Sequence, residues 1–144
     1  MSRMIFVNLP VRDLAAATRF YEAIGCEKNE QFSDDRAASM VWSDTILFML
    51  LQRDYFATFT PKHVADAGRT SEVLLALSFG SRAEVDAFAE AAARSGGKAD
   101  IRPRQELGFM YSRSIEDPDG HIFEPVWMNP DAVMAHAGDQ SASA

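Results

Sequence analysis

The sequence predicts an α+β fold made of two βαβββ modules in tandem. The first observation is the order of the periodic segments: a strand, a helix and three strands, then a connection, then the same order again. The second is the spacing within each half. Phe6 lies seven residues before the helix-capping Asp13, and Leu74 lies seven residues before the helix-capping Ser81. Such a repeat constrains the fold more strongly than any single segment does.

The first module is expected over about residues 4–52. Its helix begins at the N-cap Asp13 and ends at Gly25, and its last strand is apolar on both faces, as in a strand covered on both sides. The predicted strands are 4–11, 28–32, 37–42 and 45–51.

The connection, residues 53–71, lacks strand alternation. Pro61 suits a first helical turn, so we expect a short helix over 62–67. Its aromatic residues, Tyr55, Phe56 and Phe59, either fold back over a cleft or only anchor a long loop.

The second module is expected over about residues 72–128. Ser81 followed by Glu84 is a capping box, and the helix that it starts ends at Gly96-Gly97. The predicted strands are 72–79, 98–102, 109–114 and 121–128. Residues 1–129 then form one domain, and the small, polar segment 130–144 is expected to be flexible.

Composition excludes several classes of protein. The formal net charge is −7 with no basic cluster, which argues against nucleic acid as a partner. Met1-Ser2-Arg3 leads directly into a strand pattern with no apolar signal core or membrane span, so we expect a cytoplasmic protein. The one cysteine, Cys26, excludes an internal disulfide and a multi-cysteine zinc site, and is expected to be a buried thiol.

Near the end of the chain, Asp117-Pro118-Asp119-Gly120 predicts a tight turn between two apolar strands. The second of these strands carries Glu124. Three interpretations of this carboxylate are open: an inward-facing anchor or general base, a structural ion pair with Arg102 or Arg113, or an exposed residue.

Three motifs resemble the vicinal oxygen chelate superfamily, which includes glyoxalase I, the bleomycin-resistance proteins and the extradiol dioxygenases. They are Asn8-Leu9-Pro10-Val11-Arg12-Asp13-Leu14, Phe20-Tyr21-Glu22-Ala23-Ile24-Gly25 and Asp117-Pro118-Asp119-Gly120-His121-Ile122-Phe123-Glu124. The resemblance covers about residues 4–128. It implies curved mixed sheets around a cavity and usually a homodimer.

In metal enzymes of this family, the first and fourth strands of each module carry the ligands. By resemblance these positions are Phe6, about Phe48, Leu74 and Glu124. Three of the four are apolar, whereas a divalent metal centre needs imidazole or carboxylate donors, so we expect no metal and no other cofactor. His63 lies in the connection and His136 in the tail. His121 is three residues from Glu124, and an odd separation in a strand puts two side chains on opposite faces unless a bulge intervenes.

Other side chains could line the same cavity. Tyr111 and Arg113 share one strand face, and Trp127 offers an aromatic surface for a planar or amphipathic ligand. The predicted ligand-binding residues are Phe6, Phe48, Leu74, Tyr111, Arg113 and Trp127.

These observations lead to a principal hypothesis with two alternatives. The principal one is a glyoxalase/bleomycin-resistance-like homodimer that binds a small molecule in an apolar cavity without metal. The first alternative is an enzyme, a lyase or isomerase resembling lactoylglutathione lyase or a dioxygenase-like protein, with Glu124 as general base or as the sole remaining metal-ligand position. The second is a structural dimer whose site has decayed.

Overall fold

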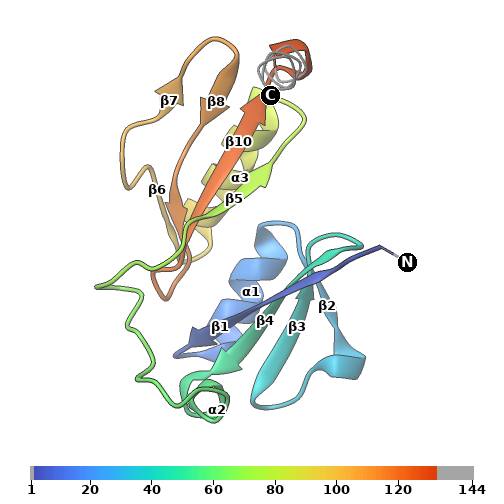
Figure 1. The fold of residues 1–144 in the computed structure, drawn as a ribbon, viewed down its shortest axis with the longest axis vertical. Coiled ribbons are helices and arrows are strands. Elements are labelled where there is room, and N and C mark those ends of the chain that lie inside the picture. Colours follow the sequence, from blue (N-terminus) through green and yellow to red (C-terminus); the bar gives the residue numbers. More distant parts are fainter. Residues whose placement is uncertain (1, 133–144) are drawn as a thin grey trace, which may run out of the picture.

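The computed structural model describes residues 2–132, and its first module has the predicted element order. The elements are β1 (Ile5–Val11), α1 (Leu14–Ala23), β2 (Glu27–Asn29), the 3-10 turn η1 (Glu30–Phe32), β3 (Ala37–Val41) and β4 (Ile46–Gln52). The sheet has the strand order β1-β4-β3-β2, in which β1 lies parallel to β4 and the other neighbours are antiparallel (Figure 1). The turn η1 replaces the second half of the strand predicted over 28–32.

The second module repeats this arrangement with two broken strands. The elements are β5 (Leu75–Ser78), α3 (Arg82–Arg94), β6 (Lys98–Ala99), β7 (Gln105–Glu106), β8 (Met110–Ser112), β9 (Ile115–Glu116) and β10 (Ile122–Met128). β5 lies parallel to β10 on one edge, and β8 and β9 both pair antiparallel with the other edge of β10. β7 pairs with β8 and β6 pairs with β9, so each of the two outer strands consists of two short pieces.

The two long helices begin as the sequence predicts. The Asp13 carboxylate accepts a hydrogen bond from the N–H of Ala16 at 3.0 Å, and the Ser81 hydroxyl accepts one from the N–H of Glu84 at 3.2 Å. Each cap satisfies a backbone donor that has no partner within the helix.

The two helices also end in the same way. Gly25 and Gly96 take the left-handed conformation, with φ of 118° and 100°. In each case the next residue, Cys26 or Gly97, donates its N–H to the carbonyl five residues earlier. This is a Schellman motif, and it confirms that the predicted glycine stops are local features of the sequence.

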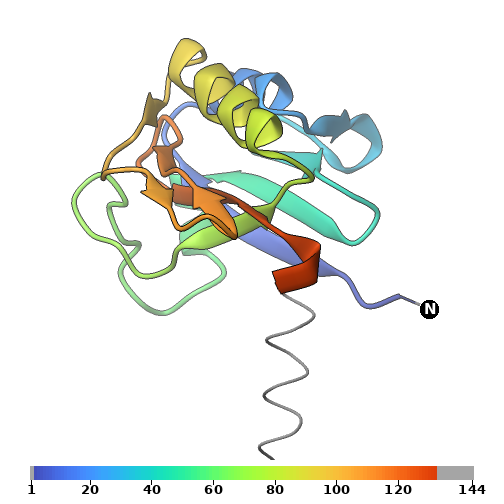
Figure 2. The same cartoon turned by 90° about the horizontal axis from the view of Figure 1, so that it is seen from above.

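One hydrophobic core joins the two modules. Helices α1 and α3 cover the same side of both sheets (Figure 2), and the core between them is continuous. At its centre the rings of Phe48 and Phe123, from different modules, lie 5.3 Å apart between centroids, and Tyr21 contacts both. The two modules therefore share one hydrophobic core.

The Asp117–Gly120 turn is confirmed, and it also ties the second module to the first. Gly120, with φ of 97°, donates its N–H to the Asp117 carbonyl at 3.0 Å. The buried Asp117 carboxylate accepts from the Tyr21 hydroxyl at 2.7 Å, and Asp119 accepts from the N–H of Arg12 at 2.9 Å.

The connection differs from the prediction. Its helix is α2 (Arg53–Ala57), directly after β4, and residues 62–67 are not helical. The Arg53 guanidinium donates to the carbonyls of Val64 and Ala65, which holds this stretch in an irregular path. Tyr55 and Phe59 pack against each other with ring centroids 5.0 Å apart.

The strand predicted over 98–102 also stops early, at Ala99, because Asp100 has φ of 56° and turns the chain. Within residues 2–132, no helix is long and apolar enough to cross a membrane. The prediction for the tail beyond residue 132, including His136, lies outside the described residues.

Candidate functional site

Each sheet has a face that the two helices leave uncovered, which we call the open face. In the first module Phe6 pairs with Leu47 and Asn8 pairs with Met49, and these side chains point to the open face. The alternate residues of the same strands, including Phe48, belong to the core.

In the second module Glu124 lies on the open face. It pairs with Ala76, and Val126 pairs with Ser112 on the same side of the sheet. Phe123 points the other way and is fully buried in the core.

The predicted position of Phe48 is wrong by one residue. Val7 pairs with Phe48 in the first module as Leu75 pairs with Phe123 in the second, so the residue that corresponds to Glu124 is Met49. Phe48 is 1% exposed and packs on the aromatic core, so it cannot line a cavity on the open face. The error arises because side chains alternate along a strand, and a shift of one residue exchanges the two faces.

Phe6 and Leu74 have the solvent access that a ligand-contacting residue needs. They are 52% and 57% exposed, respectively. Phe6 lies near the start of β1, and Leu74 directly precedes β5, at corresponding places in the two modules.

Tyr111, Arg113 and Trp127 are not brought together with Glu124. Tyr111 pairs with Trp127 in the sheet, on the side of α3 rather than on the open face. The Tyr111 hydroxyl donates to the Asp86 carboxylate of α3 at 2.6 Å. The six predicted ligand-binding residues therefore lie on two sides of the sheets and do not form one site.

Arg113 belongs to a buried charge network on that side. Its guanidinium donates to Asp86 at 3.0 Å and to both carboxylate oxygens of Asp100 at 3.0 and 2.9 Å. The Arg113 hydrogen bonds lower the pKa of Asp100, and hydrogen bonds from Tyr111 and then Arg113 lower the pKa of Asp86. Arg113 is thus a structural cation beneath α3.

Glu124 is paired with Arg102, one of the two arginines considered from the sequence. Its Oε2 accepts a hydrogen bond from Arg102 Nη2 at 2.6 Å, and its side chain is only 17% exposed. Neighbouring open-face side chains on β10, Ile122 and Val126, are apolar and partly buried. The site around Glu124 is thus an apolar surface with one charged pair at its centre.

His121 does not join Glu124. Its Nε2 lies 2.8 Å from the carbonyl oxygen of Pro10, which can only accept a hydrogen bond. The pairing of β10 with β5 continues without a bulge from Phe123 to Val126. Among the described residues, no group of three or more His, Cys, Asp or Glu side chains could hold a metal ion.

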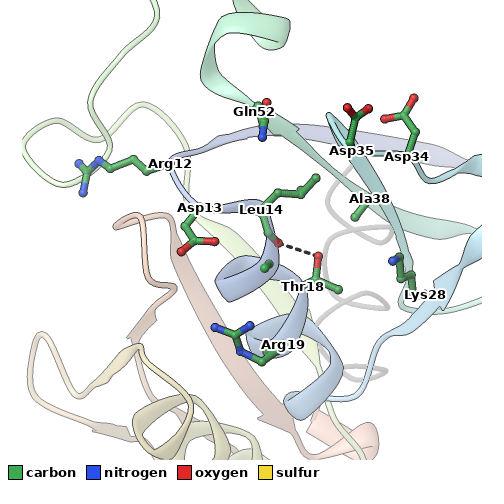
Figure 3. A pocket seen from close by; sticks show the side chains of 11 residues that line it. Arg12, Asp13, Leu14, Thr18, Arg19, Lys28, Asp34, Asp35, Ala38 and Gln52 are labelled. Atoms are coloured by element: carbon green, nitrogen blue, oxygen red, sulfur yellow. Dashed lines mark hydrogen bonds between the residues drawn. The ribbon is translucent and has the colours of Figure 1, made fainter.

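The structure contains an open groove that the sequence did not predict. It has a volume of about 700 Å³ and lies between the start of α1 and β3. Figure 3 shows the carboxylates of Asp34 and Asp35 well apart from the Arg19 guanidinium, with Lys28 at one side. Its charges are mixed, and it lies away from the open face.

A second cavity, of about 290 Å³, lies beneath the connection. Its lining includes Asn8 and Pro10 of β1, His121 beside β10, and Lys62 and His63 of the connection. No local pattern in the sequence indicates that His63 and His121 line one cavity, because they are far apart in the chain and only the path of the connection brings both to it.

Comparison with solved structures shows the same fold in several bacterial proteins. A hypothetical protein from S. aureus is 22% identical, with a TM-score of 0.74, over 88% of this chain and 95% of that one. A glyoxalase/bleomycin resistance protein/dioxygenase family enzyme from Burkholderia phytofirmans is 17% identical, with a TM-score of 0.71, over 88% and 99%. The fosfomycin resistance protein FosX from Mesorhizobium loti is 22% identical, with a TM-score of 0.62, over 93% and 96%.

Of the two sequence comparisons, the one with family models finds a match and the one with curated proteins finds none. No curated protein sequence matches the chain significantly. The family model of the Glyoxalase/Bleomycin resistance protein/Dioxygenase superfamily matches residues 3–124, which span both modules. The protein therefore belongs to the Glyoxalase/Bleomycin resistance protein/Dioxygenase superfamily.

Proposed function

We propose that this protein binds a small molecule on its open face without a metal ion. The observation that carries the proposal is the chemistry at the four strand positions implied by the family resemblance. With Met49 in place of Phe48, these are Phe6, Met49, Leu74 and Glu124. Glu124 is the single carboxylate among them, and Arg102 already binds it.

This set of side chains does not fit a divalent metal centre. Such centres take three or more nitrogen, oxygen or thiolate ligands from the protein, and the thioether of Met49 is a soft ligand suited to other metals. Phenyl and isobutyl groups at Phe6 and Leu74 supply no donor. We therefore derive no chemical step through a metal ion.

The same side chains suit an apolar or amphipathic ligand. Apolar surface supplies the larger part of small-molecule affinity, and a few polar groups orient the ligand. The Glu124–Arg102 pair would provide that orientation, since each group has further hydrogen-bonding capacity. FosX is named as a fosfomycin resistance protein, and it supports small-molecule recognition as a use of this fold.

We further propose that two copies complete the site, as a homodimer. In a single chain, Phe6 and Leu74 are more than half exposed, so the open faces are only partly enclosed. A cytoplasmic location and the absence of nucleic-acid and membrane partners stay predictions from composition.

The alternative, a lyase or isomerase with Glu124 as general base, requires this carboxylate to reach a substrate proton. Its short hydrogen bond to Arg102 competes with that role, so we place Glu124 as an orienting group.

The test combines metal dependence with ligand binding. Purified protein is assayed by thermal shift with EDTA and with Mn²⁺, Ni²⁺, Zn²⁺ or Fe²⁺, and then with a panel of aromatic and amphipathic small molecules that includes bleomycin and fosfomycin. We expect no stabilisation by the ions and stabilisation by at least one apolar or amphipathic compound. Glu124→Gln should weaken that binding, whereas the matched Glu90→Gln, at an exposed position of α3, should leave it unchanged. Stoichiometric metal, or glyoxalase activity that a metal restores, would overturn the proposal.

A further inference from the structure

The cavity beneath the connection, which we call the connection pocket, is enclosed by parts of both modules. Its volume of about 290 Å³ equals that of about ten water molecules in the liquid. This is room for a ligand the size of one amino acid. Its lining includes none of Phe6, Met49, Leu74 and Glu124, although it borders the open face at Asn8 and Ile122, so it lies beside the site proposed above.

The pocket is held in shape by specific contacts to the connection. Arg53 donates to the carbonyls of Val64 and Ala65 at 3.1 and 3.0 Å, and Arg12 pairs with Asp66 at 2.7 Å. A ligand would therefore meet a wall that is already ordered, which lowers the entropic cost of binding.

The backbone of the connection also packs closely against the Asp117–Gly120 turn. A Cβ atom at Gly120 would lie 2.6 Å from the carbonyl oxygen of Ala67 and 2.7 Å from the Cα of Gly68. The glycine thus permits the two backbones to meet, and it belongs to the pocket lining.

Two opposite charges line the connection pocket without pairing. Lys62 and Glu72 both contribute to the lining. Across residues 2–132, neither forms an ion pair within 4.0 Å, with each other or with another side chain. A ligand that carries both charges could satisfy them together.

The remaining lining suits such a ligand. The Asn8 amide donates to the carbonyl of Phe6 and keeps its oxygen as an acceptor for an ammonium group. Phe56, Val64 and Ile122 supply apolar surface for a hydrocarbon side chain.

We propose that the connection pocket binds a small zwitterion, an α-amino acid with an apolar side chain. The ligand carboxylate lies toward Lys62 and His63, its ammonium group lies toward Glu72, and its side chain packs on the apolar wall. Binding here needs no second copy of the chain and no occupant on the open face.

The proposal is tested with three compounds of the same shape and different charge. L-leucine carries both charges, L-leucinamide lacks the carboxylate, and 4-methylpentanoate lacks the ammonium group. Each is titrated into the full-length ¹⁵N-labelled protein to about 10 mM, followed by amide chemical shifts, a range that covers weak small-ligand affinities. We expect leucine to shift resonances of residues 62–73 and 120–122, and each analogue to bind about fivefold or more weakly because it loses one charge-assisted contact.

Two variants test which side chain binds each charged group of the ligand. Lys62→Met should weaken leucine binding and remove the preference for leucine over leucinamide, and Glu72→Gln should do the same for leucine over 4-methylpentanoate. Lys98→Met, remote from the pocket, and Glu124→Gln, on the open face, should leave leucine binding unchanged. The proposal is overturned if leucine shifts no resonances of the pocket, if both analogues bind as well as leucine, or if Lys98→Met weakens binding as much as Lys62→Met. Because Glu124→Gln affects only the open-face site, failure of one proposal can be told from failure of the other.

Discussion

Arg113 keeps a full charge in a side chain that is only 4% exposed. It can do so because two carboxylates, Asp86 and Asp100, accept hydrogen bonds from three of its nitrogen atoms. The network links α3, the bend after β6 and the segment after β8. It explains why a residue that looked like a cavity arginine in the sequence is a structural one.

We expect Arg113→Met to lower the free energy of unfolding by about 2 kcal/mol, measured by urea denaturation at pH 7. Loss of a buried ion-pair partner costs about 3–5 kcal/mol, and the carboxylates here are partly exposed and can be hydrated again. The control is Arg104→Ala, whose exposed contact to Asp100 at 3.4 Å should contribute less than about 0.5 kcal/mol. If the two substitutions lower the free energy of unfolding equally, the burial of Arg113 does not increase its contribution to stability.

The contribution of Asp117 to stability depends on pH in the direction opposite to that of Asp86 and Asp100, because its pKa is raised whereas theirs are lowered. Burial raises the pKa of its carboxyl group above the ordinary value of 3.8, although the Tyr21 hydroxyl and the His121 backbone N–H favour the charged form. The folded state then holds this proton more tightly than the unfolded chain does. The resulting stabilisation is present below pH 3.8 and is lost as the pH rises through the raised pKa.

Asp117→Asn cannot titrate, so its stability relative to the wild type should improve as the pH rises from about 3.5 to 7. The lowered pKa values of Asp66, Asp86, Asp100 and Glu106 destabilise both proteins in acid and cancel in this difference. Urea denaturation at a series of pH values measures it. A difference that is flat, or that falls with pH, would contradict the raised pKa.

At the scale of the elements, Gly97 marks where the end of α3 meets β9 and α1. A Cβ atom there would overlap the carbonyl oxygen of Glu116 and lie 2.7 Å from the ring of Phe20. Gly108 is different, because it has φ of 81° but no atom within 4 Å of its Cβ position. Substitution of Gly97 therefore tests steric overlap, and substitution of Gly108 tests backbone strain alone.

We expect Gly97→Ala to destabilise the protein by about 3 kcal/mol, since backbone and a buried ring must move. Gly108→Ala should cost about 1 kcal/mol, the penalty for an L-residue in the left-handed region. Thermal and urea unfolding of both variants test this contrast. If Gly97→Ala costs no more than Gly108→Ala, the packing at the end of α3 is looser than the structure shows.

The same scale shows what could be predicted from the sequence. The caps at Asp13 and Ser81 and the stops at Gly25 and Gly96 depend on neighbouring residues, so the two long helices and their order were predicted well. The face on which Phe48 lies depends on pairing with β1, which a run apolar on both faces does not specify.

The site was less predictable than the fold for a related reason. Glu124 could be singled out from its motif, but its choice of Arg102 over Arg113 depends on the turn at Asp100, which no local pattern marked. The connection pocket depends on contacts between Arg53 and the carbonyls of Val64 and Ala65. A side-chain clamp on an irregular loop has no periodic signature in the sequence.

For the whole molecule, the helices α1 and α3 lie on one side of the sheets (Figure 2), and apolar side chains on the uncovered side are exposed. Phe6, Leu74 and Met128 are 52%, 57% and 42% exposed. Apolar groups that gather on one face of a protein often mark an interaction surface. A second copy of the chain would cover them and enclose the proposed ligand site.

We therefore expect the purified protein to have twice the chain mass of 15.9 kDa when measured by light scattering after size exclusion, and Phe6→Asp with Leu74→Asp to return it to the single-chain mass. Burying two carboxylates against an apolar partner costs several kcal/mol, whereas both positions tolerate charge in the exposed, single-chain state. Phe32→Asp is the matched control, because Phe32 is 64% exposed but lies on η1, away from β1 and β5. A wild-type protein of single-chain mass across the micromolar range would refute the dimer, and dissociation by Phe32→Asp alone would move the interface to another surface. Loss of small-molecule binding together with the dimer would connect assembly to function, since the open-face site is proposed to be complete only when two chains meet.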